Sequence, residues 1–271
     1  MVALRIFSYL PNPRIWKATI TARLCGVEIE VRGASPRELS QWLWDFDARP
    51  IAEVPAVRLE NASMTVRTKC SRNGTERRRD AGQCGTHWSD RLRRSKAIQD
   101  GRISRSAAIM RAVARLGAER FPVYGRNVYE SSRIDAFLDA SLVFARDGQI
   151  YLLALSNGEM SSDLYSRMKG SFAAYLSGIE QALAPQRGFL VGDNVTLADV
   201  CFVSELCLFH NERARSSALK TAGFSLLLDN EFAKSFPRSA AHFRRLLGHP
   251  AFVPDVAGYL EKIERNDGRV N

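Results

Sequence analysis

The stretch Phe189 to Phe209, FLVGDNVTLADVCFVSELCLF, contains the strongest structural pattern in the chain. Thr196 followed three residues later by Asp199 is a short-acid form of the capping box, in which two side chains satisfy backbone N–H groups that the first helical turn leaves unpaired. The box predicts a helix that begins at Leu197. Nearly every residue from there to Phe209 is apolar, which is typical of a helix surrounded by protein. We therefore expect this helix to form the centre of a helical domain.

The residues before about position 117 alternate between strand and helix patterns. The predicted elements are a strand at Leu4 to Tyr9, a helix from Pro13 that ends at Gly26, an alternating strand at Val27 to Val31, a short Trp-rich helix at residues 38–46 and a strand at Glu53 to Leu59. A further strand at 101–103 and a helix at Ser106 to Leu116, with Gly117 as its C-cap, complete the pattern. This order predicts a small α/β domain over residues 1–117.

The chain from about residue 130 to 265 reads as helices throughout, which predicts an all-α second domain. One helix is expected to follow Ser131 or Ser132 and to end at Asp147-Gly148, and a longer one to open at Ser161. After the central helix, a polar break at 211–217 is expected, followed by helices at Phe236 to Leu247 and at Phe252 to Ile263.

The formal net charge of +10 belongs mainly to one segment. Arg67 to Lys96 holds ten Lys or Arg against three acids, so it accounts for +7 of the total. It has almost no aliphatic residue and no periodicity, which predicts a disordered surface loop. Because the charge is so local, a nucleic-acid-binding function is disfavoured. An inert insertion or an artefact of gene prediction fits the segment better than a basic interaction arm.

The cysteines argue for a reducing compartment. Their number is odd, and three of them lie in apolar helical patterns where cysteine behaves as a small buried hydrophobe. Cys70, Cys84 and His87 lack a fourth ligand and regular spacing, so we expect no metal. The sequence shows no secretory signal and no apolar run of roughly 20 residues that could span a membrane. We expect a cytoplasmic protein without membrane contact.

Three motifs together resemble the glutathione transferase superfamily. Glu53-Val54-Pro55 is similar to the strand entry where that family has a cis-proline, Ser106 to Ile109 resembles its Ser-Asn-Ala-Ile helix start, and Val195 to Asp199 resembles its capping box. Arg14 to Ala18, Lys234 to Pro237 and His249 to Phe252 look most like the transferase-like domain of the elongation factor 1 gamma subunit. The resemblance implies a thioredoxin-like N-terminal domain and an all-α C-terminal domain.

The resemblance also implies a glutathione site. Val54 and Pro55 would offer backbone N–H and C=O groups to the peptide. The helix N-terminus at Ser106 would offer unpaired N–H groups to the γ-glutamyl carboxylate. Where the family has an acid before this serine, the chain has Arg105, which would repel the γ-glutamyl ammonium. Ser8, Tyr9 and Asn12 are the candidates for the group that lowers the pKa of the glutathione thiol.

Two functions follow as expectations. The first is a glutathione transferase of the elongation-factor-gamma type, which conjugates glutathione to a small electrophile and forms a homodimer. The second is a non-catalytic interaction module with the same fold, bound to elongation-factor subunits. Arg105 and the ambiguous catalytic hydroxyl favour the second. In either case Thr196 and Asp199 are expected to have a structural role as the capping box.

Overall fold

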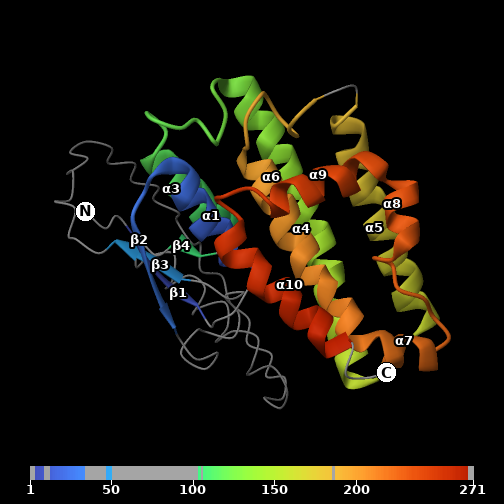
Figure 1. Ribbon diagram of the computed structural model, residues 1–271. Helices are drawn as coiled ribbons and strands as arrows, with labels where there is room; N and C mark the ends of the chain where they lie inside the picture. The colour runs from blue at the N-terminus through green and yellow to red at the C-terminus, as the bar shows by residue number, and fades with distance from the viewer. Residues whose placement is uncertain are drawn as a thin grey trace, which may run out of the picture.

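The computed structural model describes residues 4–8, 13–33, 47–50, 103–104, 106–184 and 187–267. A small sheet lies on one side and most of the helices on the other, with α1 between them (Figure 1). The elements are β1 (Leu4–Ser8), α1 (Trp16–Cys25), β2 (Ile29–Gly33), β3 (Asp47–Pro50), β4 (Ile103–Ser104), α3 (Ser106–Leu116), α4 (Val128–Asn157), α5 (Ser162–Ala182), α6 (Leu197–Phe209), η1 (His210–Arg215), α7 (Ser216–Thr221), α8 (Asn230–Ser235), α9 (Pro237–Leu247) and α10 (Val253–Asp267).

The four described strands form a mixed sheet in the order β2-β1-β3-β4. β1 pairs in parallel with β2, with Leu4 opposite Ile29, and antiparallel with β3. The connection from β1 through α1 to β2 is the predicted β-α-β unit. The structure adds a strand at Asp47–Pro50 that the sequence pattern did not indicate. The helix predicted at 38–46, the strand predicted at Glu53 to Leu59 and the basic segment Arg67 to Lys96 all lie outside the described residues.

Helices α1 and α3 pack against each other beside the sheet. Gly26 ends α1 in the left-handed region, at φ 65°, as the sequence predicted. Gly117 directly follows the last residue of α3, as predicted, and it also lies at a close contact. A Cβ added there would lie 2.4 Å from Cβ of Cys25 and 3.0 Å from its carbonyl oxygen, so glycine is required by the close approach of the two helix ends.

We expect Gly117→Ala to lower the free energy of unfolding by about 3 kcal/mol, because the new methyl group overpacks the contact with Cys25. Chemical denaturation of both proteins would measure the change. Gly178→Ala is the matched control: Gly178 lies within α5, and no atom lies within 4 Å of an added Cβ. That change should stabilise the protein by up to about 1 kcal/mol. Equal effects at the two glycines would contradict the packing argument.

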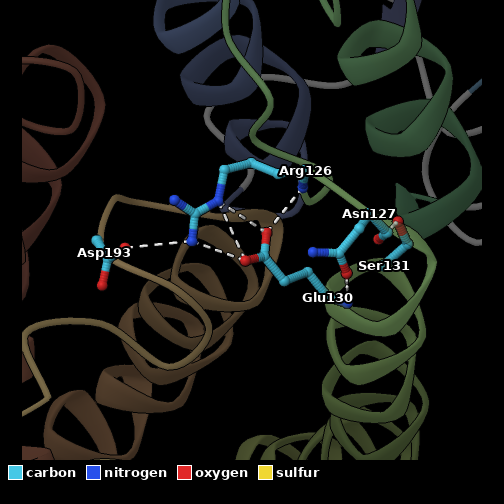
Figure 2. Close-up of polar contacts among 5 residues, drawn as sticks. All are labelled: Arg126, Asn127, Glu130, Ser131 and Asp193. Atoms are coloured by element: carbon cyan, nitrogen blue, oxygen red, sulfur yellow. Dashed lines mark hydrogen bonds and ion pairs between the residues drawn. The ribbon is translucent and has the colours of Figure 1, made fainter.

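Helix α4 begins earlier than the sequence predicted. Its N-cap is Asn127, whose side-chain oxygen accepts a hydrogen bond from the N–H of Glu130 at 2.9 Å. Figure 2 shows the Glu130 carboxylate accepting from the backbone and guanidinium of Arg126, which also reaches Asp193 at 3.2 Å. Ser131, a predicted cap, instead donates from its hydroxyl to the Asn127 carbonyl. This polar cluster joins the start of α4 to the loop before α6.

Helix α4 also ends later than predicted, because it continues through Asp147 and Gly148 to Asn157. Asp147 is a buried ion-pair partner there: its carboxylate lies 2.8 Å from Arg167 and 3.3 Å from Arg146. Burial alone would raise the pKa of Asp147, but these two arginines hold it below its ordinary value. The helix then ends at Gly158, which has φ 72°. A polar pair in the sequence was thus wrongly interpreted as a helix end.

Helix α6 begins at Leu197 behind the capping box at Thr196, as predicted. Every residue of α6 except Leu208 is buried, including the polar Asp199, Ser204 and Glu205. The helix packs on α1, α4 and α9, and the apolar core that surrounds it is continuous from the sheet to the helical half. α5 opens behind Ser161 and α9 runs to Leu247, both as expected. The proposed division at residues 117 and 130 stays a prediction.

In the part of the chain that the structure describes, none of the helices is both long enough and apolar enough to cross a membrane.

Candidate functional site

A cavity of about 260 Å³ lies where the two halves of the chain meet. Its lining comes from the start of α1, the first residue of α3, the middle of α4 and the end of α6; these residues are Arg14, Lys17, Ser106, Leu142, Val143, Ala145, Arg146 and Glu205. One wall is apolar, since Leu142 and Val143 are 43% and 52% exposed. The lining also holds three cationic side chains, those of Arg14, Lys17 and Arg146. The cavity can therefore receive a ligand that has both an acidic and an apolar part.

The innermost lining is a buried ion pair. Nζ of Lys17 on α1 lies 2.5 Å from Oε1 of Glu205 on α6, and the two side chains are 1% and 2% exposed. Burial disfavours the Lys17 ammonium, but Cys201 and Glu205 beside it raise the pKa of Lys17 above its ordinary value. The thiol of Cys201 also lies 3.0 Å from the hydroxyl of Ser141. Because Glu205 neutralises Lys17, this pair positions α1 against α6 more than it attracts an anion.

The remaining cations give the cavity its positive character. Arg14 is buried, and its guanidinium donates to Oε1 of Gln149 on α4 at 3.0 Å. Arg146 stands at the rim with its side chain 56% exposed and pairs with Asp147 at 3.3 Å. Ser106 is half-buried and opens α3, an 11-residue helix whose first N–H groups have no partner within the helix. Together these groups suit a carboxylate-bearing ligand.

The structure places the predicted site residues unevenly. Ser106 lines the cavity, and its role in glutathione binding stays a prediction. Ser8 ends β1 opposite Gly33, and its side chain is not described. Tyr9, Asn12, Val54, Pro55 and Arg105 lie outside the described residues, so their roles stay predictions. Thr196 does not belong to this cavity: it lines a separate one of about 490 Å³, beside the segment 120–126.

Asp199 proves to be more than a helix cap. Its side chain is fully buried and accepts four hydrogen bonds, from the N–H and the hydroxyl of Thr196, from the N–H of Leu190 and from Nε2 of His242. The last two partners lie outside α6, at distances of 3.1 and 2.8 Å. The carboxylate therefore joins the preceding loop and α9 to the start of the central helix.

Sequence reasoning did not select Arg14, Lys17, Arg146 and Glu205, which line this cavity. One indication was present: Glu205 is an acid within a mostly apolar helix, and Lys17 lies among the core positions of α1. Buried charges of this kind require a partner. Their pairing could not be inferred, because 188 positions separate them. Among the described residues there is no cluster of His, Cys, Asp or Glu that could hold a metal ion.

Comparison with known proteins places this arrangement in a structural class. Residues 144–250 match the family model described as "Glutathione S-transferase, C-terminal domain". Similar solved structures include the trimeric glutathione transferase TDR1 of Leishmania, at 14% identity and a TM-score of 0.58, which covers 97% of this chain. The chain spans 49% of that protein's length. No curated protein sequence matched.

Two further structures have nearly the same length as the chain. Glutathione transferase URE2P8 of Phanerochaete chrysosporium, solved with oxidized glutathione, has 16% identity and a TM-score of 0.58, with 97% of this chain and 98% of that chain covered. A glutathione S-transferase of Methylobacterium radiotolerans, solved with glutathione sulfonate, has 14% identity and a TM-score of 0.55, with 93% and 94% covered. At such identities the likeness shows the fold alone.

The protein has the glutathione transferase fold, as predicted. Residues 144–250 carry the family-model match, and the structural neighbours share the fold of the chain.

Proposed function

We propose that the protein binds glutathione in the cavity between α1, α3 and α4 and conjugates it to a small electrophile. The observation that carries this proposal is the composition of the cavity, which combines Arg14, Arg146 and the start of α3 at Ser106 with apolar residues of α4. Glutathione has two carboxylates, and a conjugated electrophile supplies an apolar group. The similar structures solved with glutathione ligands support the choice of this peptide.

In this reaction the glutathione thiol loses its proton to solvent, and the thiolate attacks an electrophilic carbon. A sulfur–carbon bond forms while the leaving group departs with its electron pair. The residue that lowers the thiol pKa is proposed from Ser8, Tyr9 and Asn12, which precede Arg14 by two to six positions in the sequence. The described cavity would contribute binding and orientation of the peptide.

Calorimetry with glutathione tests the proposal, together with conjugation of an aryl halide. Arg146→Gln should weaken glutathione binding about tenfold, the effect of losing one charge-assisted hydrogen bond. Arg167→Gln is the matched control, because Arg167 is 53% exposed, pairs with the same Asp147 and does not line the cavity. Equal losses in both variants, or wild-type affinity in Arg146→Gln, would refute the assigned cavity.

The second candidate is a non-catalytic interaction module of the elongation-factor-gamma type, favoured by Arg105 at a position where an acid would assist glutathione binding. For this candidate we expect no glutathione binding by the native chain and measurable binding by Arg105→Glu. Copurification with elongation-factor subunits would then support the module. Conjugation activity in the native chain would exclude it as the sole function.

We also propose that two copies associate through α4. Ile150 and Leu153 lie three positions apart on this helix, are 42% and 55% exposed and do not line the cavity, which leaves an apolar patch for contact with a second copy. Among the described residues, Cys25, Cys201 and Cys207 are free and buried, which supports the expected reducing, cytoplasmic location.

Leu153→Glu is expected to halve the molar mass measured by light scattering, because a charge would have to be buried in the interface. Leu116→Glu is the control, since Leu116 lies on α3 with a nearly identical exposure of 54%, against 55% for Leu153. A monomeric native protein would refute the proposed dimer directly.

A further inference from the structure

A third cavity, of about 310 Å³, lies between the end of α5 and α9. Its lining residues are Leu183, Arg187, Arg238, Ala241, His242 and Arg245. Three of these six side chains are guanidinium groups, and they come from two different segments of the chain. None of them contributes to the proposed glutathione site. A cavity with this composition is complementary to an anion.

Arg245 is held in place before any ligand binds. Its guanidinium lies 5.0 Å from the centre of the Phe189 ring and donates to the carbonyl of Gly188. It also lies 2.7 Å from Nδ1 of His242. Since arginine can only donate, this nitrogen accepts, and the proton of the neutral imidazole is on Nε2, which donates to Asp199. Arg245 is thus attached to the buried polar network of α6, and its geometry costs little to organise.

The other two arginines are less constrained. Arg238, in the first turn of α9, has a side chain that is 55% exposed and lies 3.9 Å from Glu180. The Glu180 carboxylate is already engaged, because it accepts from the N–H of Arg238 and from the N–H and hydroxyl of Ser239. Within the described ranges, Arg187 forms no ion pair. Glu180 lies beside Arg238, and the residues that line the cavity include no carboxylate.

We propose that this cavity binds a small phosphorylated ligand with at least two negative charges. Guanidinium groups match phosphate oxygens with pairs of parallel hydrogen bonds, and phosphate carries enough charge to engage more than one arginine. The start of α9 adds nothing directly, since Glu180 occupies the N–H groups of Arg238 and Ser239. Arginine side chains rather than a helix end therefore define the ligand class.

Calorimetric titration of the full chain with inorganic pyrophosphate, at fixed ionic strength, tests this inference. Arg187→Gln and Arg238→Gln should each weaken binding about tenfold and the double variant about a hundredfold, while glutathione binding stays unchanged. Thermal melts of the variants would confirm that they fold. Arg265→Gln is the matched control, because Arg265 is 70% exposed on α10, lies 4.0 Å from Glu261 and does not line the cavity.

Three outcomes would overturn the proposal. The native chain could fail to bind pyrophosphate at millimolar concentration. The double variant could bind it as the native chain does, which would assign the anion to other basic residues such as those of Arg67 to Lys96. Citrate could bind more tightly than pyrophosphate, which would replace phosphate by carboxylate as the ligand class.

Discussion

Replacing Asp199 by alanine is expected to lower the free energy of unfolding by about 5 kcal/mol, the largest effect of any single substitution considered for this protein. The change removes a fully buried acceptor and leaves four donors without it: the N–H and hydroxyl of Thr196, the N–H of Leu190 and Nε2 of His242. A lost helix cap alone would cost about 1 kcal/mol. Urea denaturation monitored by circular dichroism would separate these two magnitudes.

Asp163→Ala provides the matched control for this prediction. Asp163 is also an acid in the first turn of a helix, α5, but it is exposed. Its loss should cost about 0.5 kcal/mol through the helix dipole. The loss of unfolding free energy in Asp199→Asn should lie between the losses in the two alanine variants, because the amide keeps one acceptor oxygen. A loss near 1 kcal/mol in Asp199→Ala would show that the contacts with Leu190 and His242 contribute little.

Glu205→Ala is expected to cost about 4 kcal/mol, because it leaves the ammonium of Lys17 buried without its partner. The double variant Lys17→Met with Glu205→Leu should recover most of that loss, since two apolar groups of similar size need no compensation. Equilibrium denaturation of the single and double variants measures both effects. If the double variant were no more stable than Glu205→Ala, the cost would come from packing and not from charge.

The same pair predicts a dependence of stability on pH. The pKa of Lys17 is raised in the folded protein above its ordinary value of 10.5. The stabilisation by the charged lysine is therefore fully present below pH 10.5 and is lost as the pH rises through the folded pKa. Stability of the native chain should fall more steeply above pH 10.5 than that of the double variant. If the stability of the two proteins fell equally with pH above 10.5, the proposed contribution of the charged Lys17 would be contradicted.

Local sequence patterns were sufficient to predict the bounds of several helices. The starts of α5 and α6 were correct, because their caps at Ser161 and Thr196 lie directly in the sequence. The extent of α3 was also correct. The prediction for α4 was wrong at both ends. Ser131 or Ser132 was expected as the N-cap in place of Asn127, and Asp147 and Gly148 were interpreted as the helix end. Burial of Asp147 beside Arg167 of the next helix, a contact across 20 positions, lets the helix continue.

Less of the candidate site than of the fold could be predicted from the sequence. The motif at Ser106 indicated one wall of the cavity, because a helix start can be recognised from its own residues. The cationic residues that line the same cavity could not be recognised from their neighbours in the sequence. Arg14 precedes α1 and Lys17 lies in it, whereas Arg146 and Glu205 lie in helices more than a hundred residues later. Only the packing of α1 on α6 shows which of the many charged residues meet.

By itself, the sequence determined the two-part class of the fold and the start of its central helix, because caps and hydrophobic periodicity act over a few residues. The tertiary structure alone decided what the charged residues do. It turned Asp199 from a cap into the centre of a buried network, paired Lys17 with Glu205 and gathered Arg187, Arg238 and Arg245 around one cavity. The physical reason is that a buried charge is defined by partners that the chain brings together only on folding.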